Sequence, residues 1–263
     1  MTGKVYLIGA GPGDPQLMTL KAARALWLAD VVLIDALVNR GCLAHTRAGA
    51  RVIEVGKRCG RGSASQVFID KLLLHYSKSG NTVARLKGGD PFMFGRGGEE
   101  LQKLLSAGVE VEVIPGVTAG IAVPAMLGIP VTHRGLARGV TFVTGHGAGV
   151  DWGALARSGT TLVIYMGLRN LPKICASLIA GGLKPSTPAC VIENGTLPSQ
   201  RQVVGTLATL SGSGFHGPAL IVVGDVVQFA KKGSGPFSWK RCQVSSPDPI
   251  SGKRVLTPFL GAA

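Results

Sequence analysis

A turn of two glycines and an aspartate, Gly88-Gly89-Asp90, is the stretch of this sequence best suited to chemistry. It follows the apolar run 83–86, which predicts a strand, and it precedes a helix expected over 99–107. Ligands of open α/β sheets bind beyond the carboxyl ends of strands, and glycine lets the backbone approach a ligand closely. Gly-Gly-Asp-Pro is also a good tight turn by composition alone, but the order of the whole segment favours a binding site.

Two further strand ends carry charged residues. Asp35 follows the continuous apolar run 31–34, which is typical of a parallel strand buried on both faces. We interpret Asp35 as a functional acid rather than a loop cap, because a site is already expected at the strand ends. A third strand, 51–55, leads into the loop 56–62, in which cations alternate with glycines. Such a loop suits carboxylates or phosphates, although a solvated surface loop has the same composition.

The loop after the first expected strand argues against a nicotinamide cofactor. Residues 9–15 read Gly-Ala-Gly-Pro-Gly-Asp-Pro. A dinucleotide fingerprint needs its third glycine where Asp14 stands, and Pro12 and Pro15 prevent the loop from opening directly into a helix. A metal site is not predicted either, because His133 and His146 have no partners at ligand spacing.

The order of the expected elements predicts an α/β fold with two α/β domains. We expect an N-terminal domain over 1–133, a linker over 134–138, a smaller C-terminal domain over 139–229 and a basic tail over 230–263. Strands are expected at 5–8, 31–34, 51–55, 83–86, 110–114, 140–144, 161–165, 188–193, 202–204 and 219–223. Helices are expected at 17–28, 65–77, 99–107, 152–157 and 171–180, with another that closes at Gly128.

Composition excludes several classes of protein. The chain of 263 residues is 46% hydrophobic and 16% charged, which excludes a disordered protein. Its five cysteines are odd in number and widely spaced, so neither a disulfide framework nor a zinc site is indicated and reduced thiols are expected. We find no export signal and no apolar segment of about 20 residues, and therefore expect a cytoplasmic protein that does not span a membrane.

The net charge of +14 indicates an anionic partner. Residues 231–263 contain six basic side chains and one acid, so this +5 leaves +9 for the rest of the chain. Basic clusters of about 5–8 residues, which mark nucleic-acid-binding tails, are missing, and aromatic residues are few. A charged pocket for a small polyanion therefore fits the sequence better than a nucleic-acid-binding tail.

Seven segments occur in a fixed order: GAGPGDP (9–15), DALV (35–38), LKGGDPFMFGRGGEE (86–100), PGVTAG (115–120), GIPVTHR (128–134), YMG (165–167) and PALIVVGDVV (218–227). Together they resemble the uroporphyrinogen-III C-methyltransferase family of the tetrapyrrole methylases over residues 3–229. The resemblance implies a homodimer whose two α/β domains hold S-adenosylmethionine in the cleft between them. Asn39, where a serine often stands, and the tail from Lys231 depart from the family pattern.

The resemblance also implies the residues of the site. Asp35 and Lys57 match the family's proposed proton acceptor and proton donor. Because the family's substrate is a polycarboxylate, basic side chains near the loops are candidates to bind it. These cations are Arg58, Arg61, Arg96, Arg134 and Arg138. The residues expected around the cofactor are Pro12, Gly88, Gly89, Asp90, Met93, Thr118, Ala119, Met166 and Gly195.

The implied reaction is methylation of uroporphyrinogen III at C2 and then C7, with S-adenosylhomocysteine as the second product and no metal required. Within the same fold, a later precorrin methyltransferase is an alternative, and an RNA methyltransferase of the same superfamily is another. A basic nucleic-acid-binding module would bind in a steeply salt-dependent way without S-adenosylmethionine. The full set of motifs argues against that module, and we expect neither a nucleic-acid partner nor a membrane.

Overall fold

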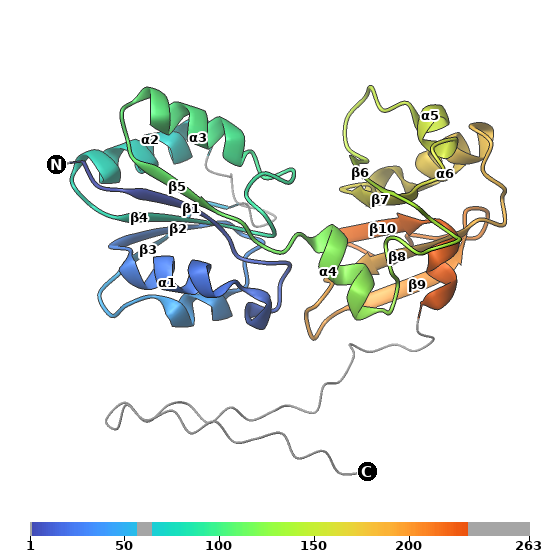
Figure 1. The fold of residues 1–263 in the computed structure, drawn as a ribbon, viewed down its shortest axis with the longest axis horizontal. Coiled ribbons are helices and arrows are strands. Elements are labelled where there is room, and N and C mark those ends of the chain that lie inside the picture. Colours follow the sequence, from blue (N-terminus) through green and yellow to red (C-terminus); the bar gives the residue numbers. More distant parts are fainter. Residues whose placement is uncertain (1, 57–64, 231–263) are drawn as a thin grey trace, which may run out of the picture.

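The computed structural model describes residues 2–56 and 65–230, which form two separate five-stranded sheets (Figure 1). The first sheet has the order β3-β2-β4-β1-β5, and all of its strand pairs are parallel. The carboxyl ends of its strands therefore lie together at one edge of the sheet. The strands are β1 (Val5–Gly9), β2 (Val31–Ile34), β3 (Arg51–Glu54), β4 (Val83–Lys87) and β5 (Val111–Ile114).

Helices cover both faces of the first sheet (Figure 1). On one face α1 (Leu20–Leu28) packs through Leu26 against Ile34 and Leu86. On the other face lie α2 (Gln66–Lys78) and α3 (Gly97–Ser106), whose buried side chains join Leu33 in a second core cluster. The helices on both faces explain why β2 and β4 are buried along their whole length.

The second sheet is mixed and has the order β6-β7-β10-β8-β9. β6 runs parallel to β7, whereas the other neighbouring pairs are antiparallel. Helices α5 (Trp152–Ala156) and α6 (Leu171–Ala180) cover one face, and α4 (Ala119–Met126) with the 3₁₀ helix η4 (Asp225–Phe229) covers the other (Figure 1). The strands are β6 (Val140–Thr144), β7 (Thr161–Tyr165), β8 (Pro188–Glu193), β9 (Arg201–Thr206) and β10 (Ala219–Val223).

Helix α4 connects the two sheets. It follows β5 of the first sheet in the chain, yet Val123 and Leu127 lie in the core of the second sheet with Val163 and Leu220. The domain boundary at residue 133 and the linker 134–138 stay predictions; residues 133 and 137 form an isolated β-bridge around a turn. In the described part of the chain, we find no helix with the length and apolar character needed to cross a membrane.

Each strand expected from the sequence forms, with ends that differ by at most two residues. The first helix differs more, because it begins at Leu20 rather than at residue 17. Thr19 has extended backbone angles and caps α1 by accepting a hydrogen bond from the Ala22 amide. Residues before it form a separate 3₁₀ turn, η1 (Pro15–Leu17); the other short 3₁₀ helices are η2 (Arg40–His45) and η3 (Leu168–Asn170).

Candidate functional site

The loops at the carboxyl edge of the first sheet are locked together through their backbones. The Gly89 amide donates to the Gly11 carbonyl at 2.7 Å, and the Gly11 amide donates back to Gly89 at 3.2 Å. Gly116, after β5, lies so close that a Cβ there would be 2.3 Å from the Gly89 carbonyl oxygen and 2.7 Å from the Gly9 Cα. Only glycine fits this crossing, which fixes the turn 88–90 between its two neighbours.

Asp90 strengthens the same crossing. Its Oδ1 accepts a hydrogen bond from the Phe92 amide at 2.9 Å, and its Oδ2 accepts one from the Gly116 amide at 3.1 Å. Both oxygens therefore hold loop backbone, and Asp90 shapes the turn in which the sequence predicts cofactor contacts.

Tyr165, at the end of β7, ties the second sheet to the start of α4. Its hydroxyl oxygen accepts from the Gly120 amide and lies next to Thr118 Oγ1, both at 2.6 Å. Burial is the main cause that raises the pKa of Tyr165, so the hydroxyl stays neutral. The Phe94 ring packs on the tyrosine with 5.0 Å between ring centroids. Thr118 is thereby anchored to Tyr165, the residue that precedes Met166 in the chain.

The loop 194–196 brings the second sheet against the first loop of the chain. The Asp14 amide donates to Thr196 Oγ1 at 3.0 Å, and the Thr196 amide donates to Gln200 Oε1 at 2.8 Å. A Cβ on Gly195 would lie 2.4 Å from the Val123 side chain, so this loop also touches α4. The predicted cofactor residues Pro12 and Gly195 thus sit in loops that are in contact.

Strained backbone is concentrated around these loops. Non-glycine residues with positive φ cost about 1–3 kcal/mol each, and they cluster at functional sites. Among the described residues, those with this conformation are Phe94, Arg96, Met166, Asn194 and Thr196. Each of them is a predicted site residue or lies within three residues of one. The nine predicted cofactor positions are also accessible: all are half-buried except Met166, which is exposed.

Asp35 lies at the same edge and is held by cations from β4. Arg85 Nη2 donates to Asp35 Oδ1 at 2.6 Å, and Lys87 Nζ is 3.9 Å from Asp35 Oδ2. Arg85 and Lys87 lie on one face of the strand and are almost fully buried, together with Glu100 of α3. Glu100 Oε1 accepts from Arg85 Nε and from Lys87 Nζ, both at 3.2 Å. Two buried cations thus face two carboxylates.

Comparison with known proteins identifies the family. The family model described as Tetrapyrrole (Corrin/Porphyrin) Methylases matches residues 4–211. The chain is a tetrapyrrole methylase. It is 49% identical over 235 residues to the uroporphyrinogen-III C-methyltransferase of Pseudomonas aeruginosa, covering 87% of this chain and 96% of the relative. The siroheme synthase of Thiobacillus denitrificans is 45% identical over 92% of this chain, which spans only 52% of that longer protein.

Solved structures agree with the fold of this methylase. A uroporphyrin-III C-methyltransferase from Thermus thermophilus, complexed with S-adenosylhomocysteine, is 42% identical with a TM-score of 0.75, over 86% of this chain and 99% of the other. A cobalt precorrin-4 methyltransferase is 29% identical with a TM-score of 0.77, over 85% and 95% of the two chains. The predicted fold class, two α/β units of the tetrapyrrole methylase type, is confirmed.

Lys87 of the methylase is electrostatically unusual. Burial is the largest cause that lowers its pKa, and the neighbouring Arg85 guanidinium lowers it further. Glu100 and Asp35 act in the opposite direction and only partly compensate. Arg85, Lys87 and Glu100 are not among the site residues predicted from the sequence. The sequence does contain a signal for them. Arg85 and Lys87 are two residues apart in β4 and therefore lie on the same face of a strand whose hydrophobic residues predict burial.

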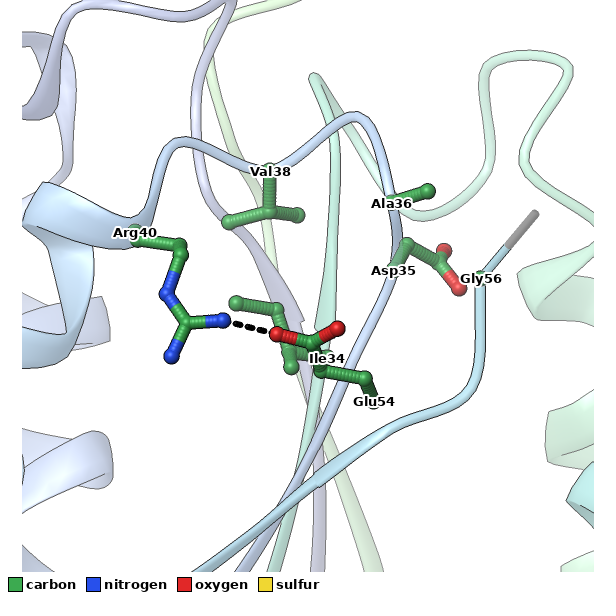
Figure 2. A pocket seen from close by; sticks show the side chains of 7 residues that line it. All are labelled: Ile34, Asp35, Ala36, Val38, Arg40, Glu54 and Gly56. Carbon is green, nitrogen blue, oxygen red and sulfur yellow. Dashed lines mark hydrogen bonds and ion pairs between the residues drawn. The ribbon is translucent and has the colours of Figure 1, made fainter. Parts of the chain in front are cut away.

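Asp35 also borders a small hollow in the methylase, shown in Figure 2. The hollow has a volume of only about 20 Å³ and is lined by residues of β2, β3 and the segments that follow them. Arg40 and Glu54 form an ion pair across it, and Asp35 points away from this pair (Figure 2). Gly56 lies so close that a Cβ there would be 1.8 Å from the Ala36 nitrogen. The hollow contains Asp35 but none of the predicted cofactor residues, and Arg40 is a cation that the sequence analysis did not select.

The predicted substrate-binding cations are spread over several places. Arg96 precedes the first residue of α3 and pairs with Glu99 at 2.6 Å; the hydrogen bond to Glu99 is the main cause that raises the pKa of Arg96. Arg134 and Arg138 are exposed near the turn that follows α4, and none of the contacts above joins them to the site. Lys57, Arg58 and Arg61 lie outside the described residues. The roles of all these residues stay predictions.

Proposed function

We propose that this methylase transfers methyl groups from S-adenosylmethionine to C2 and C7 of uroporphyrinogen III. The product would be precorrin-2, formed by way of precorrin-1, for the synthesis of sirohaem, cobalamin or both. The observation that carries the proposal is the convergence of loops from both sheets on the carboxyl edge beside Asp35. The names and high identities of the relatives from Pseudomonas aeruginosa and Thermus thermophilus support the choice of substrate.

The residues predicted to surround the cofactor fit S-adenosylmethionine. Gly88 and Gly89 are half-buried, and a Cβ on either would make only ordinary contacts at 3.6 Å or more, so no protein atom is packed tightly against this side of the turn. Phe94 and Met166 are 41% and 52% exposed and offer apolar surface to an adenosyl group. Bound S-adenosylmethionine supplies a methyl group that is already electrophilic, so the protein contributes mainly orientation and the exclusion of water.

Asp35 is the residue that we propose as proton acceptor. A proton must leave the macrocycle after a methyl group has been added, and a carboxylate within hydrogen-bond reach can take it. The hydrogen bond from Arg85 orients Asp35, whose side chain keeps 27% of its surface accessible. Lys57 is our proposed proton donor by resemblance to the family. Arg40, Arg96, Arg134 and Arg138 are candidates to pair with the carboxylates of the substrate.

We also propose a homodimer without nucleic-acid or membrane partners. Leu20 and Trp27 lie seven residues apart on α1 and are 81% and 62% exposed, which leaves an apolar helix face for a second copy. Sedimentation velocity would reveal the dimer, and a monomer at micromolar concentration would contradict it. A cytoplasmic location fits the free, buried thiols of Cys42, Cys175 and Cys190.

The deciding experiment is an anaerobic incubation of the purified protein with S-adenosylmethionine and freshly generated uroporphyrinogen III, followed by mass and absorbance. We expect a product that carries two additional methyl groups, together with S-adenosylhomocysteine. If S-adenosylmethionine binds but uroporphyrinogen III is not methylated, the proposed substrate is wrong. A panel of methylated precorrins would then be tested, because a cobalt precorrin-4 methyltransferase shares this fold.

A further inference from the structure

Four charged side chains form a nearly dry cluster under Asp35, which we call the Glu100 cluster: Asp35, Arg85, Lys87 and Glu100. The side chains of Arg85, Lys87 and Glu100 are 2%, 3% and 0% exposed, whereas that of Asp35 is 27% exposed. Burying ions costs free energy that their mutual attraction seldom recovers fully, and apolar residues often serve stability equally well. The cluster therefore calls for an explanation other than stability.

The contacts of the cluster converge on Asp35. Arg85 touches both carboxylates, Asp35 through Nη2 at 2.6 Å and Glu100 through Nε at 3.2 Å. Lys87 Nζ is 3.2 Å from Glu100 and 3.9 Å from Asp35, so the ammonium also lies between the two. Asp35 is the only member with substantial access to the solvent and to the hollow of Figure 2. Glu100 and Asp35 are thus linked through the same two cations.

Among the described residues, the other side chains around Glu100 add no further cation to the cluster. Gln66 of α2 donates its amide to Glu100 Oε1 at 3.1 Å and to Asp70 Oδ1 at 2.9 Å. Asp70 pairs with Lys103, and at the start of α3 the exposed Arg96 pairs with Glu99. Glu100 Oε2 lies 3.2 Å from Lys87 Nζ but accepts no well-directed hydrogen bond. Among the described residues, Lys87 and Arg85 are the cations that Glu100 contacts.

We infer that Glu100 is a positioning residue: its buried carboxylate holds the Arg85 guanidinium and the Lys87 ammonium beside Asp35, and through them fixes the orientation of Asp35. This inference rests on the proposed function, in which Asp35 accepts a proton from the methylated macrocycle. Glu100 never touches the substrate in this scheme. Its role is to balance the second cation, so that the cluster of two cations and two carboxylates, Asp35 included, is neutral overall.

The charge of Glu100 has a measurable consequence at Lys87. The pKa of Lys87 is already lowered, chiefly by burial, and Glu100 is one of the groups that counteract this. Replacing Glu100 by glutamine would lower the pKa of Lys87 further. Lys87 would then lose its proton at a lower pH, and at that pH Asp35 would lose one of the two cations beside it. The alkaline limit of the methylation rate would move in the same direction.

The first test compares Glu100→Gln, Glu100→Asp and Glu110→Gln in the full chain. Glu110 is an exposed carboxylate at the far end of the first sheet and serves as the control. We expect Glu100→Gln to reduce turnover about tenfold, to move the alkaline limb of the pH–rate profile to lower pH and to leave S-adenosylmethionine affinity within twofold. Glu100→Asp keeps the charge and should retain the wild-type limb. An unchanged profile in Glu100→Gln would overturn the inference.

A second test needs no substrate, so its result is separable from that of the proposed function. NMR titration of the Lys87 side chain should give a lower midpoint in Glu100→Gln than in the wild type, and equal midpoints would refute the inference. If uroporphyrinogen III is not methylated, that failure concerns the proposed function alone. If Glu100→Gln does not fold, the neutral pair Lys87→Gln/Glu100→Gln replaces it. This double variant should fold and melt above Lys87→Gln, and a double variant that melts below Lys87→Gln would count against the inference.

Discussion

At the scale of single residues, the hydroxyl of Tyr165 has more structural consequence than its place in the sequence indicates. It supplies the acceptor for the Gly120 amide and the partner of Thr118 Oγ1. Removing a hydroxyl that satisfies a buried amide leaves that amide unpaired, at a cost of about 1–3 kcal/mol. We predict that Tyr165→Phe lowers the free energy of unfolding by this amount in urea titrations.

The same variant should weaken the binding of S-adenosylmethionine about tenfold by calorimetry, because Thr118 and the start of α4 would lose their anchor. Tyr76→Phe is a matched control on α2, since no hydrogen bond of its hydroxyl is described and its ring lies beside His75. Binding that is equally strong in Tyr165→Phe and the wild type would contradict the predicted role of Thr118 at the cofactor.

The sequence revealed some residues of this site and concealed others, for physical reasons. The turn 88–90 and Asp35 were recognisable because glycines and acids at strand ends leave a local signal. Tyr165 carries no such signal, because its function depends on a helix 45 residues away in the chain. Arg85 and Glu100 were missed because the hydrophobic pattern predicts burial without predicting which ions are buried together.

At the scale of elements, the crossing of the loops after β1, β4 and β5 has no room for a side chain. A Cβ on Gly116 would meet the Gly89 carbonyl oxygen at 2.3 Å, and both sides of this contact are backbone. Overpacking of this kind typically costs about 1–3 kcal/mol. We predict that Gly116→Ala lowers stability by that amount or more and reduces S-adenosylmethionine affinity by displacing the turn 88–90.

Gly98→Ala provides the comparison for Gly116→Ala. Gly98 lies in α3, a Cβ there would have no atom within 4 Å, and alanine favours helix formation by roughly 0.5–1 kcal/mol. The melting temperature of Gly98→Ala should equal or exceed that of the wild type. If both variants melt alike, the crossing is softer than its distances indicate.

Strand positions were predictable, but their arrangement in the second sheet was not. Short apolar runs between glycines and prolines gave each strand within two residues. Periodicity does not encode which strands pair, and the mixed order β6-β7-β10-β8-β9 depends on long-range contacts. The same holds for α4, whose uniformly apolar sequence does not tell which of the two sheets it covers.

Glu193, at the end of β8, gives a prediction about acid stability. Its Oε1 accepts from the amides of His216 and Gly217, both at 2.6 Å, and its Oε2 accepts from Arg201 at 2.5 Å. Burial alone would raise the pKa of Glu193, but the bonds from Gly217, Arg201 and His216 outweigh burial and lower it below 4.5. A lowered pKa stabilises the fold above about pH 4.5, and this contribution is lost as the pH falls through the folded-state value.

We therefore predict that Glu193→Gln destabilises the protein at pH 7 by about 1–3 kcal/mol, because the charge-assisted hydrogen bonds to Glu193 are lost. The loss is not larger because half of the Arg201 side chain is exposed, so solvent partly screens the ion pair. The difference from the wild type should shrink as urea titrations are repeated below pH 4.5. Glu110→Gln, at an exposed carboxylate, should change stability by less than about 0.5 kcal/mol at either pH. A deficit of Glu193→Gln that is independent of pH would show that packing, not charge, dominates there.

At the scale of the whole molecule, the net charge of +14 should attract a polycarboxylate from a distance. Salt shortens the screening length from about 10 Å at 0.1 M to about 3 Å at 1 M. We predict that KM for uroporphyrinogen III rises several-fold between low and high KCl while kcat and the affinity for S-adenosylmethionine change little. The measurement is steady-state kinetics at constant pH across that range of salt.

Variants of the full chain can show whether this attraction comes from cations outside residues 231–263 or from the basic tail. The site hypothesis assigns it to the +9 carried outside residues 231–263, whereas a basic tail would contribute its own +5. Replacing the basic residues of the tail by glutamine tests the difference; they are Lys231, Lys232, Lys240, Arg241, Lys253 and Arg254. A salt dependence equal to that of the wild type supports a charged pocket, because the substrate then responds to cations near the cleft. Loss of most of the dependence would assign substrate capture to the tail.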